Sequence, residues 1–228
     1  MLSRLASDDI KVVTVEDPVE YEFKGINQIQ VRTDIGYTFA SALRSILRQD
    51  PDTIMVGEIR DLETAEIAIQ AALTGHLVLS TLHTNSALGA ITRLVDMGVD
   101  LFLLRAAIVG VMAQRLVRRL CPACSTPRAL DPALWASCQL DALTARYPQM
   151  TVAPRHADGC GECNHTGYRG RLVIAEFMPF TPQVQARFAE NSSFSDLAAL
   201  GERSMREDGL LKVLAGQTSI DEVLRVVT

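Results

Sequence analysis

Residues 53–87, "TIMVGEIRDLETAEIAIQAALTGHLVLSTLHTNSA", contain the pattern that decides the fold class. Two short apolar runs, 53–56 and 77–82, flank a helical pattern that ends at Gly75. Short, fully apolar runs next to amphipathic helices are typical of parallel strands that are covered on both faces of a sheet. The strand–helix–strand order therefore predicts an α/β fold with a mostly parallel sheet.

The same alternation continues on either side of this stretch. The β-branched run "IKVVTV", residues 10–15, predicts another strand. The helical pattern that begins at Phe39 follows Thr38, a residue type that favours helix N-caps. Two further helices are expected, at about 86–96 and about 101–120. The first half of the chain thus supplies the strands and helices of one sheet domain.

The composition changes at Cys121, where the regular alternation stops. Residues 121–170 are rich in proline, glycine and polar residues and show weak periodicity, which indicates a small inserted module. From about Pro182 the pattern is helical again, and Ser219 precedes Glu222 by three residues, as in a helix capping box. Three parts are therefore expected: a sheet domain at 1–120, a cysteine module at 121–170 and a helical C-terminal region at 171–228.

The overall composition is that of a soluble globular protein. Hydrophobic residues make up 48% of the 228 positions, and the formal net charge is -5. The longest strongly apolar run, "LFLLRAAIVGVMA", is too short to span a bilayer and contains Arg105. The acidic balance argues against a nucleic-acid-binding protein. The start of the chain lacks a signal-peptide pattern, so a cytoplasmic location is expected.

Four of the five cysteines form two CxxC pairs, which residues 125–159 separate. This spacing is typical of a tetrahedral zinc site in which each pair supplies two thiolates. Because all four ligand positions are filled, a structural zinc ion is expected rather than a catalytic one. The expected ligands are Cys121, Cys124, Cys160 and Cys163.

Other residues of the cysteine module leave alternatives open. His156 and His165 lie close to the second pair in sequence and are less favoured substitute ligands. A nucleic-acid-binding zinc ribbon is the functional rival. Arg169 and Arg171 would suit it, but the module lacks a broad basic face with aromatic stacking platforms. Cys138 is expected to be a small buried hydrophobe.

Chemically useful side chains follow three of the predicted strands. In open parallel sheets, ligands bind beyond the carboxyl ends of the strands. Carboxylates at that edge can orient a water or hold a hydrated Mg²⁺, while arginine and histidine can stabilise charge on a phosphate. The residues at this edge are Glu16 and Asp17, then Gly57, Glu58 and Arg60, and then His83, Thr84 and Asn85.

The two histidines that flank the predicted strand 77–82 are expected to have different roles. An extended strand rises about 3.3 Å per residue, so His76 and His83 would lie about 23 Å apart. One phosphate cannot contact both side chains. His83 is therefore assigned to the ligand edge, and His76 to a structural or subunit-contact role at the opposite edge.

Several segments resemble the sequence boxes of a known motor family. "TVEDPVEY", "LRQDPDTIMVGEIRDLETAEIA" and "TGHLVLSTLHTNSA" closely resemble the Asp box, the Walker B segment and the His box of secretion ATPases. These are the hexameric motors of type II secretion and type IV pilus assembly. "CPAC" and "CGECNHTGYRGR" match the tetracysteine module of the type II secretion and pilus-extension branches. The resemblance covers essentially the whole chain and implies a RecA-like P-loop ATPase core, ATP and Mg²⁺ as cofactors, and a hexamer.

The resemblance also implies roles for the residues at the sheet edge. Glu16 in the Asp box would activate the attacking water, and Glu58 would take the Walker B role of organising Mg²⁺ and its waters. Gly57 stands where many P-loop enzymes carry an aspartate, so metal coordination is expected to be indirect. His83 would contact the γ-phosphate region.

Four more residues are expected to serve the nucleotide site. Asp17 and Arg60 lie at the same sheet edge as the catalytic candidates. Arg44 and Arg48 are four residues apart and therefore on one helix face. They are expected to make nucleotide or subunit contacts, with a solvated helix face as the alternative.

The chain contains no Walker A motif. That motif needs a lysine directly after a glycine, because backbone amides cradle the phosphates while the lysine reaches the β and γ groups. Lys11, Lys24 and Lys212 instead follow isoleucine, phenylalanine and leucine. We therefore expect the C-terminal portion of a secretion ATPase that, by itself, neither binds nor hydrolyses ATP well.

Three functions stay open at this point. The first is a motor subunit that couples ATP hydrolysis to pseudopilus assembly and protein export in type II secretion, peripheral at the inner membrane of a Gram-negative bacterium. The second is a type IV pilus extension ATPase. The third is a non-enzymatic, zinc-bearing module that docks to inner-membrane platform proteins or to intact subunits. The tetracysteine module disfavours the pilus-retraction branch, and no nucleic-acid partner is expected.

Overall fold

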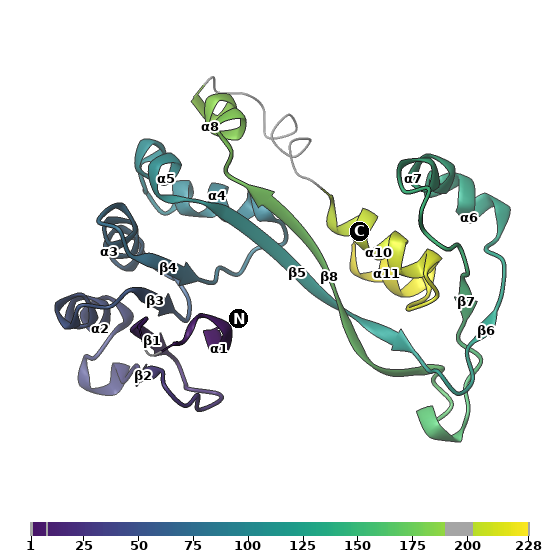
Figure 1. The fold of residues 1–228 in the computed structure, drawn as a ribbon, viewed down its shortest axis with the longest axis horizontal. Coiled ribbons are helices and arrows are strands. Elements are labelled where there is room, and N and C mark those ends of the chain that lie inside the picture. Colours follow the sequence, from purple (N-terminus) through teal and green to yellow (C-terminus); the bar gives the residue numbers. More distant parts are fainter. Residues whose placement is uncertain (1, 8, 190–202, 228) are drawn as a thin grey trace. The chain divides into compact units, whose positions relative to one another are not determined.

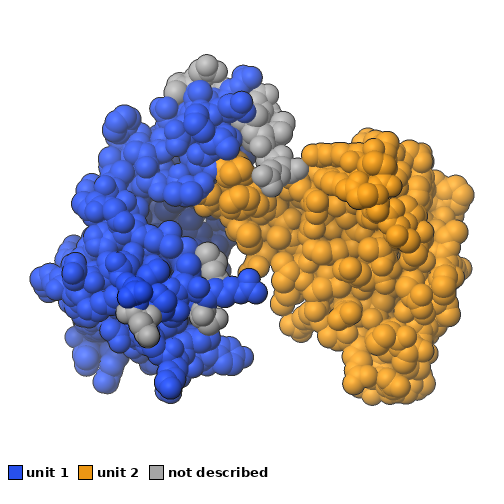
Figure 2. Space-filling view, viewed as in Figure 1, with its two compact units in different colours: residues 1–109, 180–194 blue, residues 110–179, 195–228 orange. Residues whose placement is uncertain are grey.

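The chain folds into two compact units. The computed structural model describes residues 2–7, 9–189 and 203–227. Unit 1 comprises residues 1–109 and 180–194, and unit 2 comprises residues 110–179 and 195–228 (Figure 2). Residues 190–202, which belong to the helical region expected at 171–228, lie outside the described residues.

Unit 1 is built on a four-stranded sheet with the strand order β2-β1-β3-β4 (Figure 1). All three neighbouring pairs are parallel, which confirms the predicted α/β class. The predicted strands at 10–15, 53–56 and 77–82 correspond to β1, β3 and β4, whereas β2 was not predicted. The strands are β1 (Val12–Glu16), β2 (Asn27–Gln30), β3 (Thr53–Val56) and β4 (Leu77–Ser80).

The core of unit 1 lies between the sheet and the helices α2 and α3. Residues 12–15 of β1 are all buried, so both faces of this strand are covered. The predicted apolar face of α2 is buried at Leu43 and Ile46, and Thr38 caps the helix by accepting a hydrogen bond from the Ser41 N–H. The helices of unit 1 are α1 (Leu2–Leu5), α2 (Phe39–Ile46), α3 (Leu62–Leu73), α4 (Ala87–Asp96), α5 (Leu101–Ala107) and α8 (Pro182–Ala189), with 3-10 turns η1 (Thr33–Ile35) and η2 (Leu47–Gln49).

Unit 2 is organised around a long antiparallel ribbon of two strands, β5 and β8 (Figure 1). Helix α10 packs on β8, and α11 packs on β5. The strands of unit 2 are β5 (Gly110–Leu120), β6 (Thr126–Pro127), β7 (Arg155–His156) and β8 (Tyr168–Pro179). Its helices are α6 (Pro132–Ser137), α7 (Leu140–Arg146), α10 (Met205–Leu214) and α11 (Ile220–Val226), with the 3-10 turn η3 (Gly161–Cys163).

The ribbon corrects two expectations drawn from the sequence. The helix expected at 101–120 ends at Ala107, and the chain continues from Gly110 as β5. Residues 171–179, which were expected to begin the helical region, belong to β8. The partner strand of β5 lies about fifty residues further along the chain, so no local sequence pattern predicts the pairing of the two strands. None of the described helices is long and apolar enough to cross a membrane.

The last helix shows how a predicted cap is used differently in the fold. Ser219 accepts a hydrogen bond from the Glu222 N–H, as a helix N-cap does. The carboxylate of Glu222 does not return to the cap. It instead accepts hydrogen bonds from the Arg118 N–H, the Arg118 guanidinium and the Arg225 guanidinium. The predicted capping box is therefore only half formed, and its acid connects α11 to β5.

Candidate functional site

The loops that follow β3 and β4 bring three predicted site residues together. The Glu58 carboxylate, 12% exposed, accepts a hydrogen bond from the Arg60 guanidinium through Oε1 and lies 3.0 Å from His83 Nε2 through Oε2. The Arg60 contact lowers the pKa of Glu58, and His83 adds to this effect against the opposing desolvation. Glu58 is therefore an anion at neutral pH, held between a guanidinium and an imidazole.

Backbone contacts fix the loops that carry these side chains. The Gly57 N–H donates to the Val15 carbonyl at 2.7 Å, and the Ile59 N–H donates to the Thr81 carbonyl at 3.1 Å. A Cβ at Gly57 would lie 3.1 Å from the same Val15 oxygen, which is tighter than an ordinary contact. The Thr81 hydroxyl also donates to the Gly57 carbonyl. Glycine is thus the residue that lets the ends of β1 and β3 approach closely.

Glu16, the last residue of β1, is held by two neighbours. Its Oε1 accepts hydrogen bonds from the Thr14 hydroxyl at 2.6 Å and from Gln28 Nε2 at 2.9 Å. The Gln28 amide also bonds the Phe23 N–H and the Tyr21 carbonyl, so it links β2 to the loop after β1. Among the described residues, no hydrogen bond reaches Oε2 of Glu16.

Asp17 and Arg60 interact through charge. The pKa of Arg60 is raised, first by its hydrogen bond and charge interaction with Glu58 and then by the charge of Asp17. The sheet edge therefore holds Glu58, Arg60 and His83 in direct contact, with Asp17 close enough to act electrostatically on Arg60.

Arg44 and Arg48 lie in two successive helical elements. Arg44 lies in the last turn of α2 and pairs with Glu63 of α3 at 2.6 Å. Arg48 lies in the 3-10 turn η2 that follows α2. The tighter winding of that turn changes the angular spacing that four residues would have in an α-helix.

His76 lies at the end of α3. Its Nδ1 is 2.9 Å from the Ala71 carbonyl and 3.2 Å from the Thr74 hydroxyl. These are contacts to the C-terminal turn of α3, where the Ala71 carbonyl also accepts hydrogen bonds from the Thr74 hydroxyl and the His76 N–H. The contacts are those of a structural side chain at the opposite end of β4 from His83.

The four paired cysteines converge in unit 2. Their sulfur atoms lie within 4.8 Å of one another. The Cys121–Cys160 pair is 4.0 Å apart, and the Cys124–Cys163 and Cys160–Cys163 pairs are 3.8 Å apart. A tetrahedral zinc ion at about 2.3 Å from each sulfur requires sulfur atoms about 3.8 Å apart. The cluster therefore has the dimensions of a four-thiolate metal site.

The turn around the second pair supplies N–H donors to one sulfur. Cys163 Sγ accepts hydrogen bonds from the N–H groups of Cys160 and Gly167, each at 3.2 Å. Burial opposes the ionisation of Cys163, but these donors and the neighbouring thiols lower its pKa to about 6. Desolvation raises the pKa of Cys124 to about 12. These shifts favour the thiolate at Cys163 and the protonated thiol at Cys124, and a bound divalent cation would favour the thiolate form of its ligands.

Gly159 and Gly167 make this turn possible. Both have positive φ, and a Cβ on Gly159 would lie 2.7 Å from the His165 carbonyl oxygen. The candidate ligand His156 is instead hydrogen-bonded to Asp158 at 3.0 Å. Cys138 is 7% exposed and packs in the core between α7 and α10, as expected for a small hydrophobe.

The sequence pattern did not reveal Thr14, Gln28 or Thr81 as parts of the site. Thr14 and Gln28 hold Glu16, and Thr81 holds the loop of Glu58. The one available signal was the polar run "NQIQ" at 27–30, which follows the acidic loop and contains no apolar strand pattern.

The chain is similar to proteins of bacterial secretion systems. Residues 1–225 match the family model described as "Type II/IV secretion system protein". The chain is 54% identical to type II secretion system protein E of Pseudomonas aeruginosa, over 94% of this chain and 42% of that protein. It is 48% identical to type II secretion system ATPase E of Vibrio cholerae, over 99% of this chain and 44% of that protein. The chain thus spans less than half the length of these curated relatives.

Solved structures share the fold. The pilus retraction motor PilT with bound ADP has a TM-score of 0.71 and 27% identity, over 99% of this chain and 55% of that chain. The ATPase DotB of Legionella pneumophila has a TM-score of 0.64 and 22% identity, over 99% of this chain and 54% of that chain.

Proposed function

Because the chain belongs to the type II/IV secretion system protein family, we propose that it is the C-terminal part of a hexameric motor ATPase. The motor would couple ATP hydrolysis to pseudopilus assembly and protein export in type II secretion, as a peripheral protein at the cytoplasmic face of the inner membrane. The observation that carries the proposal is the Glu58 carboxylate held between Arg60 and His83 beyond the carboxyl ends of β3 and β4. Parallel sheets bind phosphate-bearing ligands at that edge.

The side chains at this edge fit the chemistry of phosphoryl transfer to water. Glu58 and Asp17 offer the carboxylate oxygens that hydrated Mg²⁺ prefers, and a bound Mg²⁺ would neutralise charge on the β- and γ-phosphates. Glu16 is a base whose Oε1 is fixed, so its Oε2 can take a proton from water. Arg60 and His83 would stabilise charge on the transferred group.

The experiment uses a chimera because the chain spans less than half of its relatives. Residues 1–228 replace the matching segment of protein E in Pseudomonas aeruginosa, which is 54% identical. The chimera is expected to restore ATP hydrolysis and secretion in a strain that lacks protein E. Glu16→Gln and Glu58→Gln should each abolish hydrolysis. Glu66→Gln, which removes an exposed carboxylate of α3, should not. A folded hexameric chimera whose hydrolysis is unaffected by Glu58→Gln would refute the assignment.

A second candidate function is supported by the lysine positions. None of the three lysines follows a glycine, so this chain by itself lacks the phosphate cradle of a P-loop. Titration of the chain with MgATP by calorimetry should then show no binding. In that case the chain would act as a docking module for inner-membrane platform proteins or intact subunits. To distinguish pilus assembly from secretion, residues 1–228 can replace the matching segment of a type IV pilus extension ATPase. Restored pilus assembly would then favour the pilus function.

We further propose that the cysteine cluster holds a structural zinc ion. The sulfur spacing suits zinc, and the four ligands leave no position open for a reacting water. The ion would fix the turn that contains the second pair to the end of the ribbon. Metal analysis of the purified chain should give one zinc per chain.

A further inference from the structure

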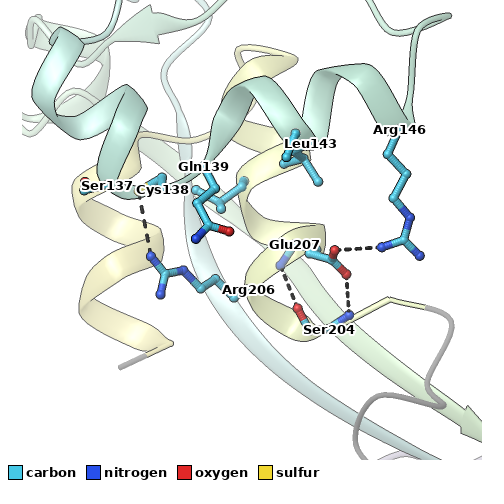
Figure 3. Close-up of a pocket in the computed structure, with 10 residues that line it drawn as sticks. Ser137, Cys138, Gln139, Leu143, Arg146, Ser204, Arg206 and Glu207 are labelled. Atoms are coloured by element: carbon cyan, nitrogen blue, oxygen red, sulfur yellow. Dashed lines mark hydrogen bonds and ion pairs between the residues drawn. The ribbon is translucent and has the colours of Figure 1, made fainter.

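Unit 2 contains a cavity that neither the sheet edge nor the cysteine cluster uses. It has a volume of about 380 Å³ and lies between the α6–α7 hairpin and the N-terminal turn of α10 (Figure 3). This volume is at the lower end of the range for small-molecule pockets, on the order of 300–1,000 Å³. The lining residues that matter here are Cys138, Leu143 and Leu210 among the apolar ones, and Gln139, Arg146 and Arg206 among the polar ones.

The floor of the cavity is apolar. Cys138, Leu143 and Leu210 are buried residues of the core that joins α7 to α10, yet they also line the cavity. An apolar side chain placed there would lose contact with water and gain contact with these three side chains. Ala142, which is exposed, also lines the cavity, and its small side chain does not obstruct the opening.

The rim carries a positive charge that no described acid balances. Glu207 is already paired with Arg146 at 2.8 Å and accepts the Ser204 N–H at 3.0 Å. Arg206, by contrast, contacts the Cys138 thiol at 3.9 Å, which is its one hydrogen-bond partner among the described side chains. A thiol is a weak partner for a guanidinium, which has five N–H donors.

The position of Arg206 in its helix also leaves its positive charge without electrostatic compensation. It is the second residue of α10, where the helix dipole is positive and acidic side chains are favoured. The charge of Arg206 is therefore not stabilised by its own helix. A carboxylate that approaches the rim would meet the guanidinium in a geometry suited to two hydrogen bonds.

We propose that this cavity is a docking site for a short acidic segment of a partner protein. An apolar side chain of the segment enters the cavity, and the carboxylate of a neighbouring Asp or Glu pairs with Arg206. Every residue that lines the cavity belongs to unit 2, whereas the nucleotide edge belongs to unit 1.

Two capped peptides test the proposal on the full chain. Ac-Ala-Asp-Phe-Ala-NH2 carries the acid and the apolar side chain, and Ac-Ala-Asn-Phe-Ala-NH2 is the neutral control. Binding is followed through the methyl NMR signals of Leu143 and Leu210. The acidic peptide should shift both signals in a saturable way and bind about tenfold more tightly than the neutral one, because a charged partner strengthens the hydrogen bonds.

Variants separate the charge from the cavity. Arg206→Gln should bring the affinity for the acidic peptide down to that for the neutral one, whereas Arg119→Gln, at an exposed arginine of β5, should leave it unchanged. Ala142→Phe should block both peptides while the remaining NMR spectrum stays that of the folded chain. Equal affinity for the two peptides, or no shifts at saturating peptide, would overturn the proposal. Tighter binding of 3-phenylpropionate than of the acidic peptide would overturn it in favour of a small-molecule carboxylate site.

Discussion

Replacing Glu222 by glutamine should destabilise unit 2 strongly at neutral pH. The Glu222 side chain is 1% exposed and pairs with Arg118 at 2.8 Å and with Arg225 at 2.7 Å. Glutamine keeps the size of the side chain but removes its charge, and its amide group then faces guanidinium donors. Arg118 and Arg225 thereby lose a charged acceptor, but their side chains are 49% and 62% exposed and water can replace it, so the cost lies at or below the lower end of the roughly 3–5 kcal/mol for breaking a fully buried pair.

The pKa of Glu222 gives a separate magnitude. Desolvation raises this pKa, but the hydrogen bonds from Arg118 and Arg225 outweigh it and lower the pKa from 4.5 to about 2. That difference corresponds to about 3 kcal/mol of stability at neutral pH. Because the folded-state pKa lies below the ordinary one, the contribution is present in full above about pH 5. It decreases as the pH falls, to less than about half at pH 3, and vanishes below about pH 2.

The assay relies on the single tryptophan of the chain. Trp135 lies in α6, so its fluorescence reports on unit 2 during urea unfolding. Glu222→Gln should lower the free energy of unfolding by about 3 kcal/mol at pH 7 and by much less at pH 3. Asp221→Asn, which removes the exposed neighbouring carboxylate, should change it by less than about 0.5 kcal/mol. A Glu222→Gln effect that is equally large at both pH values would show that the charge is not the cause.

Three further outcomes are expected. Cys124→Ser should abolish tight zinc binding and the thiolate absorption of a cobalt-substituted chain, whereas Cys138→Ser should preserve both. Cobalt bound by four sulfur ligands in the Cys124→Ser variant would contradict the proposed ligand set. Arg60→Gln should raise the pKa of Glu58 toward its ordinary value, because the largest cause of its lowering is removed, and a carboxyl-carbon NMR titration that shows no change would disprove this electrostatic account. Gly57→Ala should destabilise unit 1 by about 1–3 kcal/mol, because the added methyl group would press on the Val15 carbonyl of β1. Amide hydrogen exchange of the β1 and β3 residues measures this loss. Unchanged protection of these amides would show that the strand ends can separate freely.

The sheet could be predicted from the sequence where the strands are apolar. β1, β3 and β4 carry β-branched or leucine-rich runs between helical patterns, and that signal survives without any tertiary information. β2 could not be predicted, because its polar residues "NQIQ" form a strand only through pairing with β1. For β5, the apolar residues before Gly110 continue a helical pattern, and the partner strand that converts the following stretch into a ribbon is remote in sequence.

The candidate site was predictable at the level of its charged residues. Glu58, Arg60 and His83 lie in the loops that follow β3 and β4, and the parallel sheet places the ends of those strands at one edge. The supporting residue Gln28 could not be foreseen. Its role depends on the parallel register between Thr14 of β1 and Gln28 of β2, which brings its amide to Glu16. Polar side chains that position a carboxylate leave no periodic pattern in a single sequence.

A metal ion in the tetracysteine cluster would also close a loop in the chain. With a metal bound, Cys121 and Cys163 become the two ends of a closed loop that contains both α6 and α7. Closing a loop of this length removes conformational freedom from the unfolded chain worth about 4 kcal/mol, in the same way that a disulfide would. The metal would then act on the α6–α7 hairpin without touching it. Its removal would favour the unfolded form of a segment whose own hydrogen bonds are all still in place.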